Sequence, residues 1–149
     1  MDMFFVPDPI STATRDRLWA LIGEDIEGIL ADFYDRLENS GHRPLLDRTD
    51  VELLKHKQIN HWRKLFCHPL DDEYARRLEK MHARHLGIGL SIGQYVTAYL
   101  HLKDAFQQAV MRQAAGAGEA VTLLLALNRI VSDDIVRALA ADENAAATG

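Results

Sequence analysis

Apolar residues recur at intervals of three and four along most of the chain, and no stretch shows the strict alternation that is typical of a half-buried strand. The first such run covers residues 14–38, where Gly23 and Gly28 could kink the helix or divide it in two. Further helices are predicted over residues 50–66, 71–85, 91–110 and 119–141. The pattern therefore predicts an all-α fold.

Capping residues and helix breakers divide these runs. Thr49 with Glu52, and Ser91 with Gln94, have the spacing of capping boxes and are predicted to start two of the helices. The breaks between helices are predicted at Asn39-Ser40-Gly41, Pro69, Gly87 with Gly89, and Gly116-Ala117-Gly118.

The last predicted helix is apolar on more than half of its circumference, because Leu123, Leu124 and Leu125 follow one another directly. Such a helix needs two packing partners, and the second could be another copy of the chain. We expect an N-terminal extension over residues 1–13, a single domain over residues 14–141, and a tail or the start of a linker over residues 142–149.

Composition narrows the class of protein. The chain has 149 residues, 48% of them hydrophobic, which suffices for one domain with a core. A net charge of −5 without a dense Lys/Arg run argues against nucleic acid as a partner. Cys67 is the single cysteine, so no internal disulfide can form. The N-terminus lacks the pattern of a signal peptide, and no apolar run is long enough to span a membrane, so we expect a cytoplasmic protein.

Seven histidines offer candidate chemistry, although most single histidines on helices are ordinary surface or core residues. His82 and His85 could share a zinc ion, but the sequence lacks a cluster that would supply the remaining ligands. Glu79 and His82 form a Glu-x-x-His motif, of which a di-iron bundle needs two. A haem iron needs only one protein ligand, and a single His85 among apolar helices permits this.

Three landmarks in order resemble the globin domain of globin-coupled sensors over about residues 33–102. They are Phe33-Tyr34-Asp35-Arg36-Leu37; His61-Trp62-Arg63-Lys64-Leu65-Phe66 with Asp72 and Tyr74; and His85-Leu86-Gly87-Ile88-Gly89-Leu90 with Tyr95 and Val96-Thr97-Ala98-Tyr99. The resemblance implies a globin-like fold of the globin-coupled sensor type, with an extra N-terminal helix.

The resemblance also implies roles for individual residues. His85 would be the proximal ligand of haem b, and the Tyr34 hydroxyl would donate a hydrogen bond to bound O2. Lys57 and Gln58 lie on the distal helix, where a register error of one residue would exchange their roles. The residues expected to line the haem pocket are Phe33, Tyr34, Leu54, Gln58, Ile88, Leu90 and Tyr95.

The chain departs from the family pattern beside the ligand. Gly87 stands where the family has an arginine two residues after the ligand. His82-Ala83-Arg84 mimics the family's His-x-Arg and makes His82 an alternative ligand. Only His85 keeps the family spacing to Gly89 and Tyr95, which favours His85.

The function implied by the resemblance is that of a gas sensor for O2, with CO and NO as other ligands. In the family the last two helices form a homodimer and relay binding to a C-terminal output domain of diguanylate cyclase, kinase or methyl-accepting type, so we do not expect this chain to be an enzyme itself.

Two alternatives stay open: a haem globin with redox, NO or peroxide chemistry, and a haem-free helical dimerisation module. Distal polarity could come from Lys57, Gln58 or His61, and a sixth iron ligand from His56 or His61.

Overall fold

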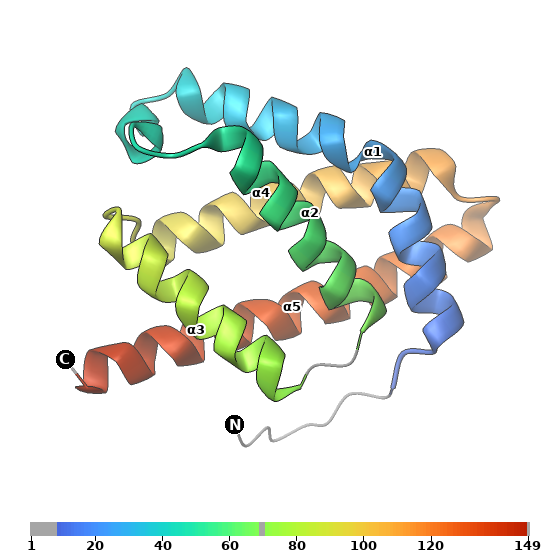
Figure 1. Cartoon of the computed structure of the whole chain (residues 1–149). Coiled ribbons are helices and arrows are strands. Elements are labelled where there is room, and N and C mark those ends of the chain that lie inside the picture. The colour runs from blue at the N-terminus through green and yellow to red at the C-terminus, as the bar shows by residue number, and fades with distance from the viewer. Residues whose placement is uncertain (1–8, 69–70, 149) are drawn as a thin grey trace.

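The computed structural model describes residues 9–68 and 71–148, and the regular structure within these ranges is entirely helical (Figure 1). The prediction of an all-α fold is confirmed. The elements in chain order are α1 (Thr12–Glu38), the 3-10 turn η1 (Arg43–Leu46), α2 (Val51–Cys67), α3 (Asp72–Gly87), α4 (Ile92–Gln113) and α5 (Ala117–Thr148).

The first helix, α1, is continuous over 27 residues, so neither Gly23 nor Gly28 divides it. Its axis bends between the dark-blue and light-blue halves in Figure 1. The Ser11 side chain caps the helix by accepting a hydrogen bond from the Thr14 amide at 3.1 Å. Within the described residues α1 is the first helix, so the extra N-terminal helix that the resemblance implies is not present as a separate element.

The two predicted capping boxes have different outcomes. Ser91 and Gln94 form one, since each side chain accepts a hydrogen bond from the backbone amide of the other. The prediction for Thr49 with Glu52 is wrong, because the carboxylate of Asp50 caps α2 by accepting from the Leu53 amide at 3.1 Å. Asp is as good an N-cap as Thr, and here it stands one residue closer to the helix.

The core is centred on the indole of Trp62, where α2 meets α4. Its ring makes edge-on contacts with Tyr99 at 5.0 Å and Phe106 at 5.1 Å between centroids. Around it, α1 packs against α2, α4 and α5, and α4 packs against α5. The third helix, α3, lies against α5, as the yellow-green and red ribbons in Figure 1 show. The Trp62 ring therefore links α2 to α4 in the core, and α3 packs on the outside against α5.

The last helix is longer than its apolar pattern predicts. It begins at Ala117, within the predicted turn, and continues through residues 142–148, where we expected a tail or linker. Its outer face keeps large apolar side chains exposed, with Val121 at 57% and Leu125 at 62%. That exposure agrees with the expectation of a second packing partner. Among the described helices, none is long and apolar enough to cross a membrane.

A Schellman motif ends α3 directly after His85. The Leu90 amide donates to the His85 carbonyl at 2.9 Å, and the Gly89 amide donates to the Leu86 carbonyl at 3.1 Å. Gly89 has a φ of 83°, in the left-handed region that favours glycine. Gly87 is the last residue of the helix itself. The predicted end of this helix at Gly87 and Gly89 is confirmed.

The two glycines are therefore expected to respond in opposite ways to alanine. Gly89→Ala places a Cβ in left-handed backbone and should lower the free energy of unfolding by about 1–2 kcal/mol. Gly87→Ala meets no atom within 4 Å and should raise it by up to about 1 kcal/mol through helix propensity. Urea denaturation of the two variants and the parent measures both values. Equal effects of the two substitutions would contradict the assigned turn.

Candidate functional site

His85 lies in the last turn of α3, with its imidazole half-buried beside the ring of Tyr95 on α4. The two ring centroids are 5.2 Å apart, with the planes tilted by 41°. The pKa of His85 is lowered to about 4, mainly by burial and to a smaller extent by the neighbouring charges of His82 and Arg84. The imidazole is consequently neutral at physiological pH, which is the form that binds a metal ion through a ring nitrogen.

His82, one turn earlier on α3, faces a different neighbour. Its Nε2 lies 3.2 Å from Oδ1 of Asp142, near the end of α5. The two histidines are three positions apart and so differ in direction around the helix. The structure thus places His85 beside α4 and His82 beside α5.

A second group of predicted residues meets between α1 and α2. The hydroxyl of Tyr34 donates a hydrogen bond of 2.7 Å to Oε1 of Gln58. Phe33 makes an edge-on contact with the Tyr34 ring at 5.2 Å. Burial raises the pKa of Tyr34, and the hydrogen bond with Gln58 only partly offsets this. Tyr34 is therefore a protonated donor at physiological pH. Lys57 is exposed, so Gln58 is the distal-helix residue that faces Tyr34.

The remaining predicted pocket residues are placed around these two groups. Leu54 is half-buried on α2, one turn before Gln58, and Leu90 is half-buried after α3. Ile88 lies in the turn that ends α3, with half of its surface exposed. A cavity of about 240 Å³ opens beside Tyr34 and is lined by Tyr34, Glu38, Arg43, Leu46, Asp47 and Val51.

The set of donors at the site fits a haem. The His85 imidazole beside the Tyr95 ring is the kind of axial ligand that a haem iron needs, and Tyr34 and Gln58 form a separate polar group between α1 and α2. Zinc and di-iron sites need three or more ligands close together. Within residues 9–68 and 71–148, no group of three His, Cys, Asp or Glu side chains is arranged to hold a metal ion.

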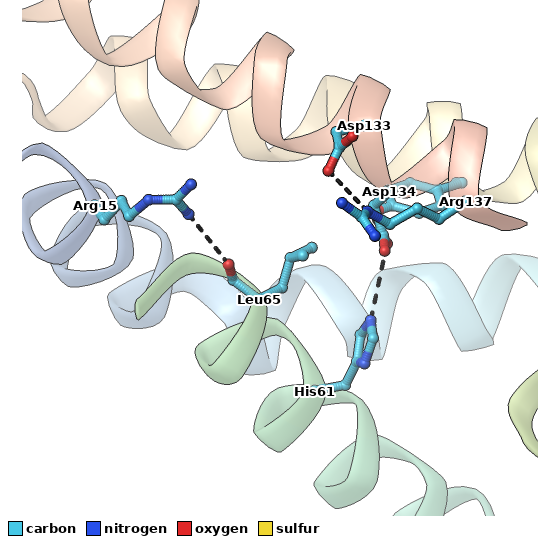
Figure 2. Close-up of polar contacts among 7 residues, drawn as sticks. Arg15, His61, Leu65, Asp133, Asp134 and Arg137 are labelled. Carbon is cyan, nitrogen blue, oxygen red and sulfur yellow. Dashed lines mark hydrogen bonds and ion pairs between the residues drawn. The ribbon is translucent and has the colours of Figure 1, made fainter. Parts of the chain in front are cut away.

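One polar residue in the core was missed by the sequence analysis. Asp134 of α5 is fully buried, and its Oδ2 accepts a hydrogen bond of 2.6 Å from the Tyr99 hydroxyl. Figure 2 shows His61 reaching from α2 toward the same carboxylate, with 3.9 Å between Nε2 and Oδ2. The spacing of Val131, Asp134 and Ala138 on one helical face is a signal that could have revealed the burial.

Comparisons with known proteins agree with this architecture. A model of the Protoglobin family matches residues 12–142. The structure is similar to the globin domain of the Geobacter sulfurreducens globin-coupled sensor, with a TM-score of 0.76, 18% identity and 87% of each chain covered. It is also similar to the globin domain of E. coli DosC in a ferric form, with a TM-score of 0.76 and 13% identity over 89% of this chain and 90% of that one. None of the curated proteins matches.

The low pKa of His85 predicts a specific dependence of stability on pH. Between pH 6.5 and 4 the unfolded chain takes up a proton at this residue that the folded chain does not. The resulting contribution to the free energy of unfolding is intact above pH 6.5 and is lost as the pH falls toward 4, by at most about 3 kcal/mol. Denaturation of the haem-free protein over this range, with and without His85→Gln, measures it.

The matched control is His42→Gln, which removes an exposed histidine before η1. It should leave the slope of stability against pH as in the parent. A His85→Gln protein that loses as much stability as the parent between pH 6.5 and 4 would show that the His85 imidazole is not kept neutral by burial.

Proposed function

This chain belongs to the protoglobin family, and on that basis we propose that it binds haem b through His85 and senses a diatomic gas, O2 in the first place. The observation that carries the proposal is the neutral imidazole of His85, held beside Tyr95 at the end of α3. A haem would supply an iron with an open position for O2, CO or NO. His82 is a weaker candidate because its Nε2 lies 3.2 Å from the Asp142 carboxylate of α5, away from the Tyr95 ring, although the two groups form no hydrogen bond.

Two tyrosines would prepare this chain for the haem on opposite sides. Tyr95 packs against the His85 ring, and this contact restricts rotation of the imidazole about its side-chain bonds. On the distal side, the Tyr34 hydroxyl is protonated at neutral pH, as a tyrosine ordinarily is, and burial raises its pKa further. Gln58 holds the Tyr34 hydroxyl until a bound gas competes for the same donor. The cost of this exchange is small, since one hydrogen bond replaces another.

The alternative of redox, NO or peroxide chemistry needs further polar groups at the distal side. The structure supports only Gln58 in that role, because Lys57 is exposed and His61 is directed to Asp134. His56 is also exposed. Neither His56 nor His61 is therefore favoured as a sixth ligand of the iron. Sensing therefore accounts for more of the observed contacts than redox chemistry does.

Signalling would use the last two helices. Exposed apolar residues such as Leu100 on α4 and Leu125 on α5 suit a homodimer contact there. In the proposed role, residues 14–141 are the sensor domain, and α5 leads to a C-terminal output domain of diguanylate cyclase, kinase or methyl-accepting type in the cytoplasm. The chain itself then acts by binding and not by catalysis. In the alternative of a haem-free dimerisation module, the same apolar surface of α4 and α5 would form the dimer, and His85 would have no role in binding.

The direct test is the visible spectrum of the purified chain after haem reconstitution, beside His85→Ala. We expect a Soret band and a stable oxy spectrum in the parent, and loss of bound haem in His85→Ala. His82→Ala is the matched control and should keep the parent spectrum, because His82 pairs with Asp142. If His82→Ala loses haem and His85→Ala keeps it, the ligand is reassigned. If the parent takes up no haem, the dimerisation module is the better account.

The role of Tyr34 predicts a selective effect on O2. Tyr34→Phe removes one hydrogen-bond donor from the distal side and should raise the O2 dissociation rate constant about tenfold, with a smaller effect on CO. Stopped-flow measurement with both gases provides the comparison. Tyr74→Phe is the control, since the buried Tyr74 hydroxyl has no hydrogen-bond partner among the residues that the structure describes. Equal changes for O2 and CO in Tyr34→Phe would rule out a donor role for the hydroxyl.

A further inference from the structure

Helices α2 and α4 both reach the buried carboxylate of Asp134 on α5. Tyr99 of α4 donates to Oδ2 at 2.6 Å, and Nε2 of His61 on α2 lies 3.9 Å from the same oxygen. The carboxyl group is fully buried, and burial of a carboxyl group costs free energy unless hydrogen bonds compensate for the lost water.

Each of these two partners lies one turn from a residue of the candidate haem site. On α2, Gln58 precedes His61 by three residues and holds the Tyr34 hydroxyl. On α4, Tyr95 precedes Tyr99 by four residues, and the two rings meet edge to face at 5.9 Å. Tyr95 also contacts His85. The distal and proximal sides of the site therefore converge on one residue of α5.

The carboxylate is not fully satisfied. Among the described residues, Oδ1 of Asp134 is buried without a hydrogen-bond partner, and so is Nε1 of Trp62, whose ring contacts both His61 and Tyr99. Native proteins leave few buried polar atoms unpaired. The contact with His61 is about 1 Å too long for a hydrogen bond. Helix shifts of about 1–2 Å are common in switching proteins and would be enough to form it.

We propose that Asp134 is a positioning residue that couples both sides of the haem site to α5, by shifting its hydrogen bonding between Tyr99 and His61 as α2 and α4 move. The inference rests on the proposed gas-sensing function. Asp134 has two arrangements in this scheme, one with Tyr99 and one with His61. A ligand shifts α5 because it changes the free-energy difference between these two arrangements. Asp134 contacts neither haem nor gas, and it acts through Tyr99 and His61.

The test measures amide hydrogen exchange across α5 in the ferrous full chain, with and without CO. In the parent we expect CO to change exchange around residues 127–141 by about threefold or more. Asp134→Asn has nearly the same shape as the parent residue but replaces one carboxyl oxygen by an amide that only donates, and it should abolish this CO-dependent difference. A purely structural role would change exchange equally in both states and would leave the difference intact.

Two further variants keep the test decisive. Asp133→Asn, which removes the neighbouring ion pair with Arg137 (3.0 Å), should keep the CO-dependent difference. Tyr99→Phe keeps the ring and removes only the hydroxyl, so it replaces Asp134→Asn if that variant does not fold. A parent without any CO effect in α5, or an effect that survives both Asp134→Asn and Tyr99→Phe, overturns the inference while a Soret band still supports haem binding. Absence of the Soret band overturns the proposed function itself.

Discussion

The packing of the Trp62 indole against α4 is the contact on which the rest of the molecule depends. It holds α2 and α4 together through Tyr99 and Phe106. Gln58 lies one turn before Trp62, and Tyr95 lies one turn before Tyr99. The same contact that forms the core thus links the helix that carries Gln58 to the helix that carries Tyr95. A large aromatic ring is well suited to this role because it has few rotamers and much area to bury.

The helices could be predicted from the sequence because apolar spacing reports directly on which face is buried. The pattern was less informative at the ends. Asp50 displaced Thr49 as a cap because the choice between adjacent capping residues depends on local backbone angles. The helix over residues 117–148 outruns its apolar stripe because alanine favours helix without needing a packing partner. Absence of an apolar pattern marks the end of the core and need not mark the end of a helix.

For the candidate site, local spacing carried the choice of His85 and Gln58, and the fold places both beside predicted neighbours. What the sequence could not supply were contacts between distant segments. The pairing of His82 with Asp142 joins residues 60 positions apart, and nothing near either residue indicates it. Asp134 was overlooked since an acidic residue next to Asp133 resembles a solvated pair. Its burial follows from where α2 and α4 cross α5, which is a property of the tertiary structure.

The length of α5 has a mechanical consequence. At about 1.5 Å of rise per residue, the 32 residues form a rod of about 48 Å. Asp134 lies near its middle, and about 21 Å of helix follow it up to Thr148. A stiff rod that pivots at an internal point converts a small tilt there into a larger sideways displacement at its tip. A tilt of α5 at Asp134 would therefore move the C-terminal end of the helix further than its centre, and it would carry along α3, which packs against α5 and places His82 beside Asp142.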